Sequence, residues 1–329
     1  MQQITFLIET QEEIDIRIDK LLSKKVLKNI DISRNKIKDL ISKNYLKKNG
    51  DIFTNTSYKT RLNDKFVFDI PSQKITIEPQ NIPLDIVYED DDMLVINKQA
   101  GIISHIGAGK FTDTLVNALL YHYGKENLSN INGEERVGIV HRLDKDTTGL
   151  MVIAKNNKAH KSLAEQIKTK TLKRNYLALI WGTIIPKKGK IEGYIGRNKK
   201  NRLKMQMYKN QNDGKYSLTN YEIKKVYGNG TLSLIECRLD TGRTHQIRVH
   251  LSHIKHPLIG DGLYGGHSRK LSKDLKINET DRKFIEKFPR QVLHSYKISF
   301  FQPTTNEIKT FEIDYPKDIK VLIKKLEEL

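Results

Sequence analysis

The sequence has only one cysteine, Cys237, among its 329 residues. A single cysteine cannot form an internal disulfide or a zinc site built from cysteine ligands, and it fits a reducing compartment. Long apolar runs are also missing, because no stretch approaches the roughly 18–20 residues that cross a bilayer. The first residues lack the basic and apolar segments of a secretory signal. We therefore expect a cytoplasmic protein without a membrane association.

Acidic residues are few for a chain so rich in lysine. The 58 Lys and Arg exceed the 39 Asp and Glu, which gives a formal net charge of +19. The excess is concentrated in residues 151–215, which hold 17 Lys and Arg against three Asp and Glu. Such a concentration is typical of a surface that binds a polyanion. Nucleic acid is the favoured partner, and an acidic lipid surface is the weaker alternative.

Two motifs that would imply a bound nucleotide or metal are incomplete. Before Gly109-Lys110, Ser104 stands where a phosphate-binding loop has glycine, and Phe111 follows where it has Ser or Thr. Four histidines lie between residues 245 and 256, but neither an HExxH pattern nor a neighbouring cysteine supports a metal site. We expect no metal and no cofactor.

Residues 1–72 predict a small α+β domain. Apolar residues at helical spacing follow Thr10, which begins a capping-box pattern, and Ser33 can cap a second helix. Helices are therefore expected within residues 10–44.

A turn and a strand complete this domain, and a linker ends it. Asn49-Gly50 predicts a tight turn, and residues 65–70 alternate as a strand does. The prolines that follow mark a linker over residues 73–83. The remainder, residues 84–329, is expected to be a second and larger domain.

Short apolar segments dominate this second domain, and helices do not alternate regularly with them. That pattern predicts an α+β fold with a mixed, largely antiparallel sheet. Strands are expected at residues 85–88, 93–97, 138–140, 150–154, 176–181, 221–227, 231–239 and 247–251, and helices at 115–123 and 158–170.

A charge-dense turn separates two apolar segments of this domain. His141, Arg142, Asp144, Lys145 and Asp146 lie between them. A polar group fixed between two core strands is held rigidly, as a catalytic site requires. The neighbouring cations would keep a buried carboxylate ionised. A surface turn with salt bridges would show the same spacing.

A second dense segment begins at a turn over Thr241-Gly242. Arg243, His245, Arg248 and His250 then decorate a predicted strand, in which Arg248 and His250 share one face because strands have a period of two. We interpret this face as a cleft wall that meets an anion, and the alternative is an exposed strand face.

These segments resemble the RluA-type pseudouridine synthases, and within them the ribosomal large-subunit synthase D branch. The resemblance rests on HRLDKDTTG at 141–149, TGRTHQIRVH at 241–250 and HPLIGDGLYGG at 256–266, and it covers residues 84–315. It implies that residues 84–329 are a catalytic domain with the pseudouridine synthase fold. Residues 12–70 resemble the small RNA-binding domain named after ribosomal small-subunit protein four.

The resemblance also implies roles for four residues. Asp144 would be the catalytic aspartate, and Arg248 its ion-pair partner. Arg142 would help to hold the target nucleotide out of its stack, and Tyr176 would pack on the uracil. The implied reaction breaks the N1–C1′ bond and forms a C5–C1′ bond in one pocket, without a cofactor. Asp144 would either attack C1′ or abstract a proton from C2′.

The implied substrate is RNA, with large-subunit ribosomal RNA favoured and transfer RNA as an alternative. A non-catalytic RNA-binding or ribosome-assembly protein is the competing class, but binding alone does not require Asp144. We expect a monomer. Residues expected to contact RNA are basic and lie in the small domain and in a predicted hairpin: Arg17, Lys20, Arg34, Lys36, Lys38, Lys187, Lys188, Lys199 and Lys200.

Overall fold

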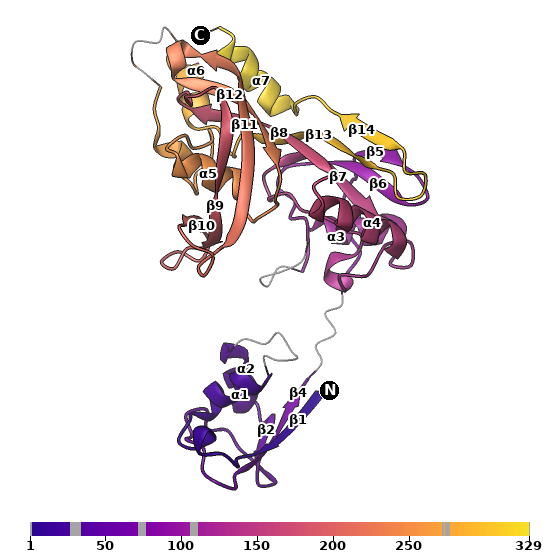
Figure 1. The fold of residues 1–329 in the computed structure, drawn as a ribbon, viewed down its shortest axis with the longest axis vertical. Helices are drawn as coiled ribbons and strands as arrows, with labels where there is room; N and C mark the ends of the chain where they lie inside the picture. The colour runs from indigo at the N-terminus through magenta and orange to yellow at the C-terminus, as the bar shows by residue number, and fades with distance from the viewer. Residues whose placement is uncertain are drawn as a thin grey trace. The chain divides into compact units, whose positions relative to one another are not determined.

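A computed structural model describes residues 2–26, 34–71, 77–105, 111–271, 273 and 277–328. The chain forms two compact units, residues 1–76 and 77–329 (Figure 1). In the described ranges, no helix has both the length and the apolar character that crossing a bilayer requires.

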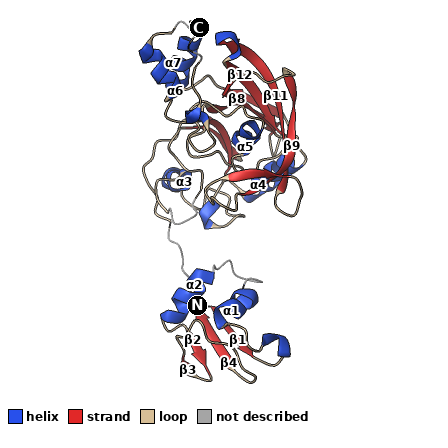
Figure 2. Cartoon of the chain, turned by 90° about the vertical axis from the view of Figure 1, so that its left-hand side faces the viewer, coloured by secondary structure: helices blue, strands red, loops and turns tan. Residues whose placement is uncertain are grey.

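The first unit is a four-stranded antiparallel sheet with two helices on one face (Figure 2). The sheet order is β1-β4-β2-β3, and Phe66 and Phe68 of β4 pack against Leu22 and Ile37 of the helices. The elements are β1 (Gln2–Leu7), α1 (Ile18–Val26), α2 (Arg34–Ser42), β2 (Leu46–Lys48), β3 (Asp51–Ile52) and β4 (Lys65–Ile70).

The tight turn at Asn49-Gly50 and the strand at residues 65–70 are confirmed. The helix expected from Thr10 is wrong, because α1 begins only at Ile18 and the Thr10 side chain makes no cap hydrogen bond. Backbone pairing with Thr60 draws the intervening residues out of a helix. Ser33 lies outside the described residues.

The second unit is built on one sheet with the order β10-β9-β11-β12-β8-β13-β7-β6-β5, and β14 pairs with β13. Every pair is antiparallel except β7 with β13, so the mixed, largely antiparallel sheet is confirmed. The strands are β5 (Ile86–Glu89), β6 (Met93–Lys98), β7 (Thr148–Ala154), β8 (Lys173–Trp181), β9 (Lys188–Arg197), β10 (Met205–Tyr208), β11 (Lys215–Tyr227), β12 (Leu232–Leu239), β13 (Leu293–Phe301) and β14 (Ile308–Glu312).

Helices cover this sheet and fill its concave side (Figures 1 and 2). Helix α4 packs on β7 and β13, whereas α6 and α7 pack on β8, β11 and β12. Helix α5 lies against β9, β10 and β11. The helices are α3 (Leu115–Tyr123), α4 (Asn157–Lys168), α5 (Gln246–His253), α6 (Glu279–Glu286) and α7 (Lys317–Leu326).

The strand predicted at residues 247–251 is wrong, because these residues form helix α5. Six consecutive residues, Gln246 to Leu251, are buried. A helix buried on all sides has no polar stripe of period 3.6, so its alternating apolar residues resemble a strand. Arg248 and His250 therefore do not share a strand face.

The strand predicted at residues 138–140 is also wrong. Only Ile139 forms a bridge, to Ile153 of β7, and Gly138 adopts a left-handed φ of 70°. A Cβ at Gly138 would lie 2.7 Å from the Ile153 side chain, so this position requires glycine. The segment is an irregular approach to the charge-dense turn.

Residues 77–83 were predicted to be part of the linker, but they pack on the second unit and belong to it. The Gln80 backbone donates to the Asn117 carbonyl, and the Asn117 side chain donates to the carbonyl of Glu78. Residues 72–76 lie outside the described ranges.

Candidate active site

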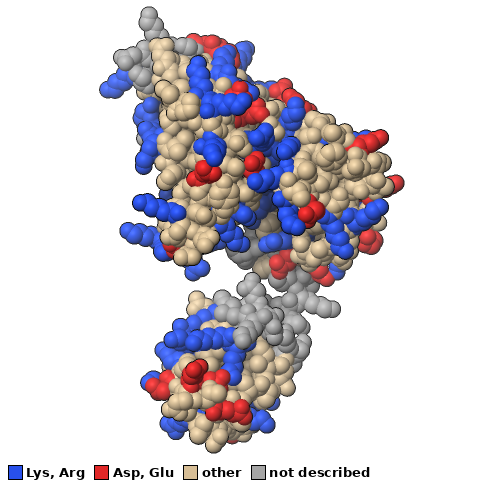
Figure 3. All heavy atoms as spheres, viewed as in Figure 1, with Lys and Arg blue, Asp and Glu red and all other residues tan. Residues whose placement is uncertain are grey.

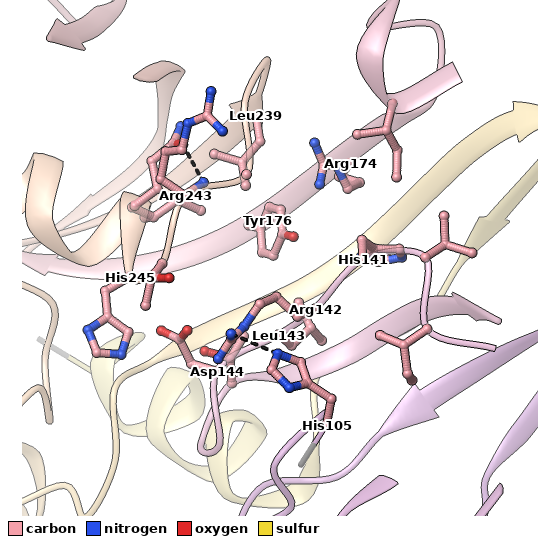
Figure 4. A pocket seen from close by; sticks show the side chains of 18 of the residues that line it. His105, His141, Arg142, Leu143, Asp144, Arg174, Tyr176, Leu239, Arg243 and His245 are labelled. Atoms are coloured by element: carbon pink, nitrogen blue, oxygen red, sulfur yellow. Dashed lines mark hydrogen bonds between the residues drawn. The ribbon is translucent and has the colours of Figure 1, made fainter. Parts of the chain in front are cut away.

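A cavity of about 330 Å³ lies where the charge-dense turn, strand β8 and the segment leading into α5 meet. Its volume falls within the range of about 300–1,000 Å³ that is common for small-ligand sites. Asp144, Arg142, Tyr176 and Arg248 all line it, although they come from positions up to 106 residues apart. Figure 4 shows the first three from close by.

Asp144 forms an ion pair with a buried arginine. Arg248 Nη1 lies 3.0 Å from Asp144 Oδ2, and its Nε and Nη2 donate to the two carboxylate oxygens of Asp261 at 2.8 and 3.0 Å. Burial opposes the charged guanidinium, but the Asp261 hydrogen bonds and the Asp144 charge outweigh it and raise the pKa of Arg248. Asp261 is fully buried, whereas Asp144 keeps one carboxylate edge toward the cavity.

The backbone of the Asp144 turn is clamped by the segment that follows β6. Ser104 Oγ donates to the Leu143 carbonyl and accepts from the Leu143 amide. Lys98 Nζ donates to the carbonyls of Lys145, Gln99 and Ile102 at 2.7–3.0 Å. Burial lowers the pKa of Lys98 to about 7. Sequence reasoning did not find Lys98 or Ser104 as supports of the turn.

Arg142 and Tyr176 occupy different depths of the cavity. Arg142 is exposed at its edge, where Nη1 lies 2.9 Å from His105 Nε2. Tyr176 is 3% exposed. Burial raises the pKa of Tyr176, so the ring is a neutral aromatic surface.

Two further residues of the cavity had no predicted role: Arg174 was not named, and His141 was named only as part of the charge-dense turn. Arg174 lies two positions before Tyr176 on β8 and is 4% exposed. His141 accepts a hydrogen bond at Nε2 from the Val152 amide, and burial together with the Arg174 charge lowers its pKa to about 3. The alternation of side chains along β8 was the sequence signal that could have placed Arg174 beside Tyr176.

The histidines near α5 have structural partners. His245 has a left-handed φ of 56° at the start of α5, and its Nδ1 lies 2.8 Å from the Tyr264 hydroxyl. His250 is buried between the hydroxyls of Ser217 and Thr219. Within the described ranges, no group of three or more His, Cys, Asp or Glu is placed to hold a metal ion.

The hairpin of β9 and β10 separates the lysines predicted to bind RNA. Lys199 and Lys200 lie in its loop, next to a hollow that shares Arg243 with the cavity wall. Lys187 and Lys188 lie at the opposite end of β9. Basic side chains gather over this part of the surface (Figure 3).

In the small unit, three basic residues converge on one buried carboxylate. Arg17, Arg34 and Lys38 lie 3.1, 2.9 and 3.5 Å from Asp19, yet each remains more than 40% exposed. Burial opposes ionisation, but hydrogen bonds from the two arginines hold the pKa of Asp19 below its ordinary value. Lys20 is exposed on α1, and the side chain of Lys36 lies outside the description.

Comparisons with known proteins match nearly the whole chain to curated relatives, and its middle part to a family model. A family model described as RNA pseudouridylate synthase matches residues 92–253. The ribosomal large subunit pseudouridine synthase D of Zymomonas mobilis is 39% identical over 99% of this chain and 97% of that protein. An uncharacterized RNA pseudouridine synthase of Aquifex aeolicus is 37% identical over the same shares. The structure of human RNA pseudouridylate synthase domain containing 1 matches with a TM-score of 0.52 at 28% identity, covering 71% of this chain and 84% of that one.

Proposed function

The chain belongs to the RNA pseudouridylate synthase family, and from this membership we propose that it isomerises specific uridines of large-subunit ribosomal RNA to pseudouridine. As a member, it is an isomerase that acts on RNA. The ribosomal target is supported by the printed name of the Zymomonas mobilis relative. We further propose that it acts in the cytoplasm as a monomer.

The observation that carries the proposal is a carboxylate that faces a cavity while a buried arginine balances it. Arg248 is shared by Asp144 and Asp261, so the three groups together keep one negative charge. A nearby cation favours the ionised form of a carboxylate. Both candidate steps, attack on C1′ and removal of the C2′ proton, need that ionised form.

The remaining residues suit a base that has left its stack. Unstacking costs a few kcal/mol, and aromatic or cationic groups in the pocket offset it. Tyr176 offers a ring inside the cavity on which uracil can pack. Arg142, which is exposed at the edge of the cavity, would fill the vacated position in the RNA or contact a phosphate.

Basic residues outside the cavity would hold the rest of the RNA. We propose that Lys187, Lys188, Lys199 and Lys200 contact phosphates along the hairpin of β9 and β10. Residues 1–72 would bind RNA through Arg17, Lys20, Arg34, Lys36 and Lys38. A second contact of this kind, joined to the first by a linker, raises the affinity for RNA, and the small unit would take no part in breaking or forming bonds.

The test is pseudouridine mapping of total RNA from cells with and without the gene. We expect at least one uridine of large-subunit ribosomal RNA to lose its pseudouridine signal. A loss confined to transfer RNA would replace the ribosomal target with the alternative substrate. Identical maps would favour a non-catalytic RNA-binding or ribosome-assembly role.

A further inference from the structure

The cavity contains a buried positive charge that nothing in the described part of the chain neutralises. Arg174 is 4% exposed, its Nε has no hydrogen-bond partner, and no described carboxylate lies within 4 Å of its guanidinium. By contrast, the buried Arg248 and Arg290 each bond to a carboxylate. A guanidinium stays charged at ordinary pH, and burying its Nε without an acceptor costs free energy. A ligand in the cavity would supply an acceptor to the same guanidinium.

The position of Arg174 on the sheet indicates which part of a ligand it would meet. Arg174 and Tyr176 are two residues apart on β8, so their side chains leave the same face of the strand. Both line the cavity and both are almost fully buried. Figure 4 shows Arg174 beside the Tyr176 ring, on the side of His141. A base that packs on Tyr176 would therefore present its edge to Arg174.

A second unpartnered donor lies in the same wall. His141 Nε2 accepts from the Val152 amide, which leaves the proton on Nδ1, and Nδ1 is buried without a partner. Five buried side-chain nitrogens lack a partner in the described ranges, and the residues that carry two of them, Arg174 and His141, line this cavity. This wall therefore holds donors that the protein itself does not use, and the rest of the Arg174 guanidinium is the part that a ligand in the cavity would meet.

We propose that Arg174 is a catalytic residue that donates hydrogen bonds to a carbonyl oxygen of the flipped uracil and stabilises the negative charge on the departing base. This inference rests on the proposed function. When the N1–C1′ bond breaks, its electron pair stays with the base and spreads onto O2 and O4. The charge disappears when C5 bonds to C1′, after which C5 loses a proton and N1 gains one. The base carries this charge whether Asp144 attacks C1′ or removes the C2′ proton.

An RNA phosphate is the other anionic oxygen that could reach a guanidinium. Arg142 and Arg243 are exposed at the rim, where the RNA backbone would pass, whereas Arg174 lies at the depth of Tyr176. The guanidinium also packs against the backbone of Gly242, where an added Cβ would lie 3.1 Å from Nη1. The edge of the flipped base is therefore a better partner for Arg174 than an RNA phosphate is.

The experiment measures kcat and KM of the full chain on transcribed, unmodified large-subunit ribosomal RNA. For Arg174→Gln we expect kcat to fall by about 100-fold or more, as when one donor to a developing charge is removed, with little change in KM. Guanidinium ions added to Arg174→Ala should restore part of kcat. The control is Arg238→Gln, because Arg238 pairs with Asn175 on the opposite face of the sheet and should leave both constants unchanged.

Three results would overturn the inference. The first is a folded Arg174→Gln variant with parental kcat and KM. The second is a folded variant with parental kcat and a raised KM, which would indicate a phosphate contact. If Arg174→Gln does not fold, Arg174→Lys decides: its ammonium lacks the planar fork, so kcat should fall about tenfold, and a parental kcat would refute the role. A parent chain without isomerase activity would instead refute the proposed function.

Discussion

Lys98 ties the segment after β6 to the turn that carries Asp144. Its ammonium donates to three backbone carbonyls, and it is 3% exposed. Lys98→Met would remove this donor from all three carbonyls. The Lys145 carbonyl would keep the Gly101 amide, but the carbonyls of Gln99 and Ile102 would lose their described partner, and each unsatisfied group costs about 1–3 kcal/mol. We expect the free energy of unfolding to fall by at least about 2 kcal/mol in urea titrations followed by Trp181 fluorescence.

Lys145→Met is the matched control, because its side chain is exposed and the same turn is otherwise unchanged. Equal stability of Lys98→Met and the parent would show that the clamp does not hold the turn. Trp181 is a suitable reporter because it is the only tryptophan and lies in the core of the second unit.

At this scale, the sequence identified part of the site. The residues that the resemblance implied, among them Asp144 and Arg248, meet in one cavity. Asp261 was not identified because its bonds to Arg248 join two segments that no local period relates. Arg174 was overlooked because it lies in a segment with many basic residues, and only its alternation with Tyr176 along β8 separates it from the exposed ones.

Among the elements, α5 shows why a strand pattern can belong to a helix. Its apolar residues alternate with Arg248 and His250, yet these polar residues are also buried, each by partners from other segments. Burial on all sides removes the period that separates the two element types. Elements with one exposed face, such as α4 and β4, were predicted close to their observed bounds.

The hairpin of β9 and β10 gives a prediction at the same scale. The double variant Lys199→Gln, Lys200→Gln should weaken RNA binding and reduce the salt slope of log Kd by about 1.4–1.8, since each of the two lost phosphate contacts removes about 0.7–0.9. The double variant Lys187→Gln, Lys188→Gln should weaken binding and reduce the slope only when the RNA is long. These lysines lie at the far end of β9, roughly 30 Å along the strand from the hairpin loop. Filter-binding titrations at several salt concentrations measure both.

The control variant carries Lys317→Gln and Lys324→Gln, which remove two exposed charges of α7 that do not line the cavity. This variant should leave the salt slope of log Kd unchanged. If both hairpin variants keep the salt slope of the parent, then Lys187, Lys188, Lys199 and Lys200 face solvent and do not contact RNA phosphates.

For the whole molecule, buried histidines set the response to acid. Burial lowers the pKa of His141 to about 3 and the pKa of His250 and His294 to about 4. The unfolded chain takes up protons on these groups below about 6.5, whereas the folded chain does not. The free energy of unfolding should therefore fall as the pH drops from about 6.5 to about 4, by on the order of 1–2 kcal/mol per histidine at pH 5.

Urea titrations at pH 7 and pH 5, followed by Trp181 fluorescence, measure this loss. His294→Gln should show a smaller loss between the two pH values than the parent. A stability that stays constant or rises on acidification would show that these histidines are not held neutral.

The small unit has its own core, so its removal tests the tether proposal. Deleting residues 1–76 should raise the concentration of RNA at half-maximal rate and leave the saturating turnover of a short RNA near the parental value. Steady-state kinetics on short and long RNA measure both. Lost turnover on saturating short RNA, from a folded second unit, would mean that the small unit helps to assemble the active site.

The catalytic role of Asp144 is the central claim, and a single substitution tests it. Asp144→Asn keeps the shape of the side chain and removes its negative charge, so it can neither attack C1′ nor accept a proton. The measurement is single-turnover formation of pseudouridine on a mapped RNA target, beside RNA affinity and the Asp146→Asn control. We predict a loss of at least about 1,000-fold for Asp144→Asn with near-parental affinity, and substantial activity for Asp146→Asn. Turnover of more than a few per cent of the parent in a folded Asp144→Asn would contradict the account.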